Sequence, residues 1–325
     1  MRCIICGKEV ENSYICGNCI VEREEVVKVE PIEIVQCSRC GFIRIGGKWK
    51  NVELEEAIKN ELLKSIYVID GFDVEDIKID LRSRELTVSG KLFGDFISVK
   101  TPFSLKIKRT TCLKCSRISG GYYESIVQLR ADNRKLKDYE ISEAKRVIQE
   151  VLENEIENEK AFLTKIEEKK EGIDFYFGGR DIGKKISRKI VEKLGGKIIQ
   201  SKKLAGRKDG VDLFRFTYLV RLPSYENGDI VLKDENICIV KDRRAGKGID
   251  IFTGKSINIK DSKVIARRSD LFEGIVVNID ETVAEVMSND GRMFMVNKPY
   301  ATEIGDSVYI FEYNNNYYAF SKKIL

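Results

Sequence analysis

Apolar and polar positions alternate along most of this chain, and three stretches show helical spacing instead. Alternation with a period of two is typical of half-buried strands, whereas apolar residues three or four positions apart indicate an amphipathic helix. Helical spacing occurs at 53–64, at 141–166 and near 181–194. The stripe of the second stretch consists of Ile148, Leu152, Ile156, Leu163 and Ile166. The pattern therefore predicts a multidomain α+β protein.

The order of these elements suggests where the domains begin and end. An N-terminal module at 1–118 carries strands inserted between residues 67 and 109. Residues 119–223 read as strands and helices in the order β-α-β-α-β-β, which favours a central α/β sandwich. After Pro223 only short strands recur, with turn signals between them. That spacing is typical of one or two small β-barrels.

Eight of the nine cysteines form four Cys-x-x-Cys pairs, and the chain has no histidine. The pairs are Cys3/Cys6, Cys16/Cys19, Cys37/Cys40 and Cys112/Cys115. Two such pairs complete a tetrahedral shell of sulfur around Zn²⁺, with bonds of about 2.3 Å. Without imidazole, any zinc site here is a closed, structural Cys₄ site. The sequence predicts two such zinc ions, and Cys238, in an apolar strand, is expected in a core.

Three arrangements of the four pairs are compatible with the spacing. We favour a local ribbon from the first two pairs, which are joined by the short segment 7–15, because it closes the smallest loop. The last two pairs would then meet across the long segment 41–111. Alternatively, the second and third pairs share a metal across segment 20–36, or the pairs are cross-braced.

The cysteines also bear on the compartment of the protein. No secretory signal precedes the first pair, so metal ligation is favoured over disulfides. No apolar run is long enough to span a membrane. We therefore expect a cytoplasmic protein.

Charge is unevenly distributed, although the formal net charge is only +5. Residues 139–171 hold ten acids against six bases, 178–208 hold eleven bases against two acids, and 241–268 hold nine against three. A solvated, highly charged surface would explain part of this pattern. The segregation itself favours a polyanionic partner such as RNA. The residues that we expect to contact RNA are Lys48, Trp49, Lys106, Lys108, Arg109, Arg117, Lys184, Lys185, Arg188, Lys202, Lys203, Arg207, Lys208, Arg243, Arg244, Lys247, Arg267 and Arg268.

Two of these sites have a second interpretation. Trp49, in a glycine-rich loop between lysines, either stacks on a base or packs against the cysteine module. The loop Gly178–Lys185 is close to a phosphate-binding loop, but Lys185 stands where Mg²⁺ binding requires Ser or Thr. The same loop at a helix N-terminus also suits an RNA phosphate.

Catalysis is not expected, because without histidine the usual general base is missing. We expect no catalytic residue and no small-molecule substrate. Two alternatives stay open. One is a nucleotide-hydrolysing or RNA-modifying enzyme that uses the loop Gly178–Lys185, and the other is a zinc adaptor that binds only proteins.

The cysteine pattern and the segment after it resemble a known family. Four Cys-x-x-Cys pairs with a long gap before the last are followed by Gly120-Gly-Tyr-Tyr-Glu-Ser-Ile-Val-Gln-Leu-Arg. Asp174-Phe-Tyr-Phe and Trp49 after the third pair add to the match. Nearly the whole chain resembles the family of the large-ribosomal-subunit export adaptor, the nonsense-mediated mRNA decay protein three family.

The resemblance implies a fold and a role. It implies an N-terminal zinc domain, a central α/β domain, an SH3-like domain at 224–269 and an OB-like domain at 270–325. It further implies a non-enzymatic, monomeric factor that binds the large (50S) ribosomal subunit during maturation or quality control. Binding there would occlude tRNA sites and subunit joining, with ribosomal RNA, the exit-site stalk protein and the anti-association factor as partners. Because the leucine-rich export tail of eukaryotic members is missing after the last strand, the chain looks like an archaeal member.

Overall fold

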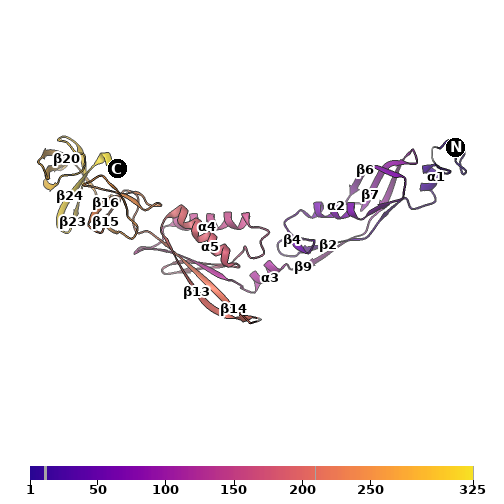
Figure 1. Cartoon of the computed structure of the whole chain (residues 1–325), viewed down its shortest axis with the longest axis horizontal. Coiled ribbons are helices and arrows are strands. Elements are labelled where there is room, and N and C mark those ends of the chain that lie inside the picture. The colour runs from indigo at the N-terminus through magenta and orange to yellow at the C-terminus, as the bar shows by residue number, and fades with distance from the viewer. Residues whose placement is uncertain (11–12, 209, 325) are drawn as a thin grey trace. The chain divides into compact units, whose positions relative to one another are not determined.

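The computed structural model describes residues 1–10, 13–208 and 210–324, which form two compact units (Figure 1). The units are Met1–Ser116 and Arg117–Leu325. Both combine small sheets with a few helices, and this confirms the predicted α+β class. The finer division into four domains remains a prediction. Among the described residues, no helix has the length and apolarity that a membrane span requires.

The first unit contains three small sheets and short helices. A four-stranded sheet has the order β4-β3-β2-β9, a three-stranded sheet the order β6-β7-β8, and β1 pairs with β5. The helix predicted at 53–64 is confirmed as α2. The elements are α1 (Gly17–Val21), β1 (Val27–Val29), β2 (Ile32–Cys37), β3 (Ile43–Ile45), β4 (Lys48–Lys50), α2 (Leu54–Lys64), β5 (Ile66–Val68), β6 (Phe72–Asp80), β7 (Glu85–Leu92), β8 (Asp95–Pro102), β9 (Leu105–Thr110) and α3 (Leu113–Ser119).

The strands β2 and β9 are far apart in sequence but lie side by side in parallel. Ile32 is opposite Leu105 at one end, and Cys37 is opposite Thr110 at the other. Everything between the two strands is therefore the crossover of one parallel pair, which needs a long connection. This connection contains the predicted inserted strands, and its apolar residues form one core with β2.

The second unit begins with a five-stranded sheet in the order β11-β12-β10-β14-β13. Only β10 and β14 are parallel. One face is covered by α4 and α5, whose apolar residues share a core with alternate positions of the strands. The elements are β10 (Ser125–Ala131), α4 (Asp138–Asn154), β11 (Leu163–Lys169), β12 (Gly172–Phe177), α5 (Arg180–Leu194), β13 (Lys197–Lys208) and β14 (Val211–Leu222).

The helix predicted at 141–166 is wrong in its second half, because α4 ends at Asn154. Between Leu152 and Ala161 the only apolar residue is Ile156, so two further helical turns would have had no face to bury. Leu163 and Ile166 instead belong to β11, which pairs antiparallel with β12. The apolar spacing continued by coincidence across a turn.

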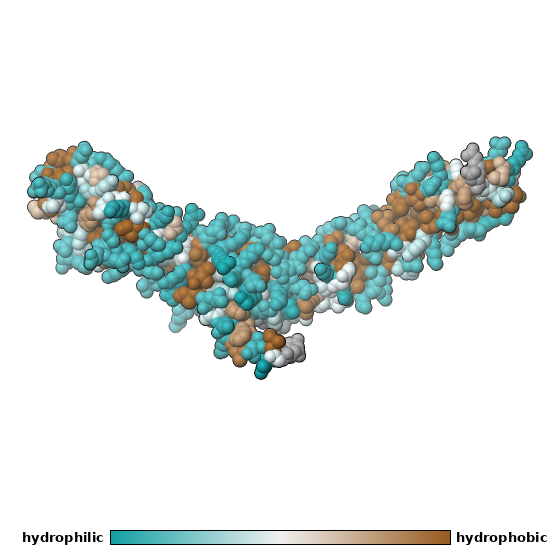
Figure 2. Space-filling model, in the orientation of Figure 1, coloured by the Kyte–Doolittle hydropathy of each residue, from teal (hydrophilic) through white to brown (hydrophobic). Residues whose placement is uncertain are grey.

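The hairpin of β13 and β14 continues past the rest of the sheet. β14 pairs with β10 only from Phe216 to Leu222, whereas it pairs with β13 along its whole length. Figure 2 shows hydrophobic residues gathered at the free end of this hairpin. Both strands are longer than the predicted 197–203 and 213–222.

Two five-stranded antiparallel sheets complete the chain. The first has the order β18-β17-β16-β15-β19 and the second β22-β21-β20-β23-β24, in agreement with two small barrels. Apolar residues of β15 and β16 pack against Phe311 and Phe320 of the second sheet. The elements are β15 (Ile230–Lys233), β16 (Asn236–Asp242), β17 (Lys247–Asp250), β18 (Ser256–Asn258), β19 (Lys263–Ala266), η1 (Arg268–Asp270), β20 (Phe272–Ile279), β21 (Val283–Ser288), β22 (Met293–Asn297), β23 (Ser307–Tyr313), β24 (Asn316–Ser321) and η2 (Lys322–Ile324).

A buried carboxylate joins the central sheet domain to the first of these small sheets. Glu140, in the first turn of α4, has no exposed surface and accepts hydrogen bonds from both terminal nitrogens of Arg134 at 2.9 and 2.7 Å. It also accepts the backbone N–H of Lys137 at 2.9 Å and a guanidinium N–H of Arg243, from the turn after β16. Arg243 donates in addition to the hydroxyl of Tyr139 at 2.9 Å. The carboxylate is therefore fully paired.

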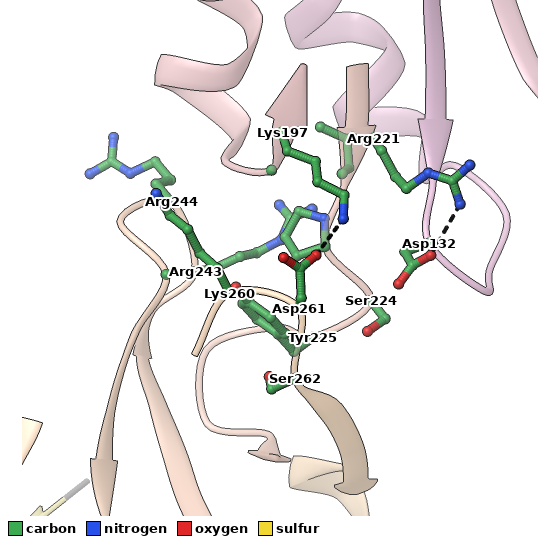
Figure 3. Close-up of a pocket in the computed structure, with 14 residues that line it drawn as sticks. Asp132, Lys197, Arg221, Ser224, Tyr225, Arg243, Arg244, Lys260, Asp261 and Ser262 are labelled. Carbon is green, nitrogen blue, oxygen red and sulfur yellow. Dashed lines mark hydrogen bonds and ion pairs between the residues drawn. The ribbon is translucent and has the colours of Figure 1, made fainter. Parts of the chain in front are cut away.

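A small cavity of about 60 Å³ lies beside this junction (Figure 3). Two cations that line it already have acidic partners, since Lys197 pairs with Asp261 and Arg221 lies 3.3 Å from Asp132. The backbone is close here as well, because a Cβ on Gly195 would lie 2.8 Å from the carbonyl oxygen of Arg243. The two domains are thus packed tightly against each other.

We expect Arg243→Met to lower the free energy of unfolding by about 3–5 kcal/mol, because it removes one partner of a buried ion pair. Arg244→Met, at the adjacent exposed position, should change it by about 0.5 kcal/mol at most. Denaturant unfolding of both variants measures the difference. Equal stability of the two would mean that Arg243 does not hold the junction.

Acid should destabilise this junction through Glu140. Burial alone raises the pKa of Glu140, but hydrogen bonds from Arg134 and from the Lys137 N–H outweigh burial and hold this pKa below its ordinary value. The resulting stabilisation is complete above the ordinary carboxyl pKa and is lost as pH falls through the lowered one. The free energy of unfolding of Glu140→Gln, measured against pH, should therefore fall less steeply in acid than that of the unaltered chain. Parallel curves would contradict this role.

Candidate metal centres and nucleic-acid interface

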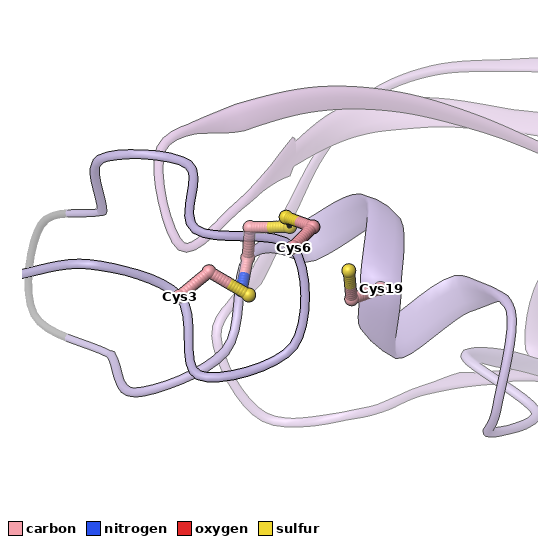
Figure 4. A group of neighbouring side chains, drawn as sticks. Cys3, Cys6 and Cys19 are labelled. Atoms are coloured by element: carbon pink, nitrogen blue, oxygen red, sulfur yellow. Dashed lines mark hydrogen bonds between the residues drawn. The ribbon is translucent and has the colours of Figure 1, made fainter.

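The first cysteine cluster gathers four thiols from the beginning of the chain. Cys3 and Cys6 lie on a tight turn that Gly7 closes at a φ of +78°, with its N–H donated to the carbonyl of Cys3 at 2.9 Å. Cys16 precedes α1 and Cys19 lies within it. All four sulfurs are within 4.8 Å of one another. In Figure 4 the side chains of Cys3 and Cys6, from the N-terminal loop, and of Cys19, from the helix, converge.

The second cluster is assembled by the parallel pair of β2 and β9. Cys37 ends β2, and Cys40 follows in a turn that Gly41 closes at a φ of +78°. Directly after β9 come Cys112 and Cys115, at the start of α3. These four sulfurs also lie within 4.8 Å of one another. This grouping confirms the favoured local ribbon and excludes the other two pairings.

The distances in both clusters suit a tetrahedral metal. Bonds of about 2.3 Å at tetrahedral angles separate two sulfur ligands by about 3.8 Å. The sulfurs of Cys6 and Cys16 are 3.5 Å apart, and those of Cys40 and Cys112 are 3.7 Å apart. In each cluster one cysteine is exposed and three are buried, so the sulfurs are largely shielded from water. Both clusters can therefore hold a metal ion.

Backbone N–H groups prepare one thiol of each cluster for ligation. The N–H groups of Cys6 and Cys16 lower the pKa of Cys3 to about 6. Burial raises the pKa of Cys37, but hydrogen bonds from the backbone N–H groups of Cys40 and Cys112 outweigh burial and lower this pKa to about 6. Since thiolates are the metal ligands, each cluster has one ligand that is ionised at neutral pH.

Trp49 lies against the second cluster. Its ring is half-buried and packs with Phe42 beside the buried cysteines of this cluster. Of the two interpretations of this residue, packing against the cysteine module therefore has direct structural support. The ninth cysteine, Cys238, is fully buried in β16, as expected for a core residue.

The predicted RNA contacts of the first unit lie on two edge strands. Lys48 is on β4, and Lys106, Lys108 and Arg109 are on β9, at the opposite edge of the same sheet. All four are exposed, and Lys106 lies 3.4 Å from Glu33. The sheet thus displays these cations but does not bring them together.

Helix α5 carries three of the predicted contacts. Arg188 is exposed and Lys184 half-buried, while Lys185 forms an ion pair with Glu155 at 2.6 Å. Of these three predicted contacts, Arg188 alone is exposed and has no ion-pair partner among the described residues.

The glycines before and within the first turn of α5 are explained by close packing. A Cβ on Gly178 would lie 2.2 Å from the ring of Phe162, and one on Gly183 would lie 2.3 Å from the hydroxyl of Ser125. At the start of the helix the N–H of Arg180 is donated to the carboxylate of Glu124 at 3.2 Å. The carboxylate of Glu124 therefore already lies in the position where a bound phosphate would accept this hydrogen bond.

The β13–β14 hairpin displays another group of predicted contacts. Lys202, Lys203 and Arg207 are exposed, and Arg207 lies 3.5 Å from Asp212. The side chain of Lys208 lies outside the described residues. Arg215, on the partner strand, is a further exposed cation that lies in the same alternating pattern but outside the predicted contacts.

Arg243 requires a correction. We expected it to contact RNA, but it is 7% exposed and its guanidinium is bound to Glu140 and Tyr139. It is therefore unavailable to a phosphate. Its neighbours Arg244 and Lys247 are exposed and have no ion-pair partner in the described part of the chain.

Arg267 and Arg268 form contacts within the chain. Arg267 donates to the buried carboxylate of Asp229 at 2.8 Å and to the carbonyl of Ser224 at 2.9 Å. Arg268 is exposed, and its side chain packs against Gly228. Half-buried Arg117 lies over the ring of Tyr122, at 5.3 Å. The role of these residues in RNA binding remains a prediction.

Two family models match this chain. No curated protein matches the sequence significantly. A solved structure that is similar, a translation initiation factor eIF-5A family protein from Naegleria fowleri ATCC 30863, is 18% identical, with a TM-score of 0.18. The similarity covers 30% of this chain and 90% of that one. The N-terminal domain of NMD3 matches residues 3–120, which include both cysteine clusters, and the second domain of NMD3 matches residues 122–222. The chain belongs to the NMD3 family, whose domains fit a ribosome-associated factor in the biogenesis of the large subunit.

Proposed function

We propose that this protein is a non-enzymatic factor that binds the large ribosomal subunit during its maturation or quality control. The match of residues 3–222 to the two NMD3 domains carries this proposal. The factor would act as a monomer in the cytoplasm, occlude tRNA sites and block subunit joining. Ribosomal RNA is the proposed main partner, with the exit-site stalk protein and the anti-association factor as neighbours.

The metal in both clusters would be zinc. Thiolate ligands select soft or borderline ions, and tetrahedral sulfur shells are typical of zinc or of iron–sulfur centres. Two knuckles on short turns, with N–H groups directed at sulfur, favour one zinc ion per cluster. Zinc would support the fold of the first unit and take no part in chemistry.

Exposed cations support contact with RNA. They are distributed over β9, α5, the β13–β14 hairpin and the turn after β16. Such a distribution suits contacts to phosphates, which depend on the shape of the RNA. The nucleotide-hydrolysing alternative has less support, because Glu124 lies at the N-terminus of α5. The adaptor that binds only proteins is left as an outcome of the experiment.

Sedimentation with purified 50S and 30S subunits across a salt series tests the proposal. We expect selective association with 50S that weakens as salt rises, because phosphate contacts release counterions. Association that is equal for both subunits would contradict the ribosomal assignment. Association with 50S that survives nuclease treatment and does not depend on salt would favour the adaptor that binds proteins.

The double variant Arg244→Glu/Lys247→Glu tests the contact at the turn after β16 without disturbing Arg243. For this double variant, the slope of log affinity against log salt concentration should become shallower by about two. A matched control is Lys78→Glu/Lys91→Glu, since both lysines are exposed on β6 and β7 and lie outside the predicted contacts. Equal binding by both double variants would remove this turn from the interface.

Metal analysis tests the two centres separately. The purified protein should contain two zinc ions per chain, and Cys112→Ser should lose the second one, because three thiolates leave the shell open. The ninth cysteine provides the control, and Cys238→Ser should keep both ions. Mass spectrometry under native conditions measures the content. Loss of both ions in Cys112→Ser would show that the two centres are not independent, and loss of neither would show that Cys112 is not a required ligand.

A further inference from the structure

The free part of the β13–β14 hairpin lacks the support that other strands of the sheet have. We call residues 202–207 and 211–215 the arm. β13 pairs only with β14, and β14 gains its second neighbour, β10, only from Phe216 onward. The arm is therefore a two-stranded ribbon that leaves the sheet (Figure 1). Such a ribbon is marginally stable in water by itself.

Apolar side chains nevertheless remain exposed on this ribbon. The exposed fractions are 54% for Leu204, 65% for Val211, 47% for Leu213 and 36% for Phe214. Figure 2 shows hydrophobic surface among hydrophilic residues on the projecting part of this hairpin. None of the four belongs to a core cluster in the described part of the chain. Leu204 and Phe214 are opposite each other in the register and share one face of the ribbon, whereas Val211 and Leu213 lie on the other face. Exposed apolar side chains on a projecting element indicate a binding site.

The charge of the arm indicates what class of partner it binds. Four described cations lie on the arm, against the single acid Asp212, which is paired with Arg207 at 3.5 Å. The remaining three, Lys202, Lys203 and Arg215, have no acidic partner among the described residues. An excess of three positive charges beside apolar groups is complementary to a polyanion that also has apolar faces.

Two cations of the arm each lie over an aromatic ring. The Lys202 ammonium lies 4.8 Å from the centre of the Phe214 ring. On the other face the Arg215 guanidinium lies 4.2 Å from the Tyr123 ring, whose edge meets Tyr176 at 4.9 Å. Each of these two rings thus has a cation within a few ångströms. Stacking of a base on a ring, with its phosphate on the nearby cation, is the usual arrangement in proteins that bind single-stranded nucleic acid.

We propose that the arm binds an unpaired segment of RNA, with a base stacked on Phe214 and the adjoining phosphate on Lys202, which lies on the same face of the ribbon, while Lys203 and Arg215 on the opposite face receive further phosphates of the strand. This inference rests on the proposed binding of ribosomal RNA and names the kind of RNA that the arm receives. A double helix hides the faces of its bases, so it would leave Phe214 without a stacking partner. An acidic protein surface would satisfy the cations and does not require an aromatic ring.

Fluorescence anisotropy with a short single-stranded RNA, and with the same strand annealed to its complement, tests the inference on the full chain. Phe214→Ala should weaken binding of the single strand about tenfold, and Phe214→Leu should weaken it similarly, because stacking requires a π face. Phe214→Tyr should bind as the unaltered protein does. Binding of the duplex should not change. Ile275→Ala, at a comparably exposed apolar residue of β20, is the matched control.

Three results would overturn the inference. Phe214→Leu could bind the single strand as tightly as the unaltered protein, which would assign the arm a purely apolar contact. The duplex could lose affinity as much as the single strand does. Phe214→Ala could also bind without any loss while circular dichroism shows an intact fold.

The outcome is separable from that of the proposed function. Association of the unaltered protein with 50S and no effect of Phe214→Ala on single-stranded RNA would reject the arm as the site and leave the ribosomal role intact. Loss of single-strand affinity in this variant, without any preference of the unaltered protein for 50S, would establish the arm and reject the ribosomal assignment.

Discussion

The parallel pairing of β2 with β9 is the constraint on which the first unit depends. Its register sets Cys37 opposite Thr110, so two knuckles from opposite ends of a long crossover bring four sulfurs together at the same end of one sheet. The pairing positions these thiols, and a metal bound by them would in turn close the crossover between the strands. Fold and ligand set therefore require each other, as in other small domains built around a metal.

The second unit depends on a different interaction, a carboxylate held between two guanidinium groups. Glu140 would be costly to bury alone, and Arg134 and Arg243 compensate that cost only when the turn after β16 lies against α4. The central sheet and the first small sheet are consequently joined by hydrogen bonds that form only when the two are correctly oriented. The arm, by contrast, lacks any such contact among the described residues, and this difference separates the firmly joined part of the unit from the part left for a partner.

Features that depend on neighbouring residues were predictable from the sequence, and features that depend on distant ones were not. The two-residue spacing of each cysteine pair is local, and it identified the eight cysteines whose sulfurs form the two clusters. The burial of Arg243 depends on Glu140, far earlier in the chain, so a basic turn was indistinguishable from an RNA contact. Similarly, the end of α4 depends on pairing between β11 and β12, and the projection of the arm depends on where β10 begins. The scarcity of apolar residues after Leu152 is a local sign of the end of α4, whereas the length of the arm is not encoded in the apolar spacing of β13 and β14.

The two metal centres differ in how much chain must exist before their ligands are complete. The ligands of the first are complete at Cys19, whereas the second needs Cys115. Because synthesis proceeds from the N-terminus, a nascent chain completes the first centre while Cys37 and Cys40 still lack their partners. While the crossover is being translated, Cys37 and Cys40 are the only two of the four cysteines of the second cluster that could bind a metal. With metal in both clusters, the order of the cysteines along the chain would impose an order of loading, and the pairing of β2 with β9 would close last.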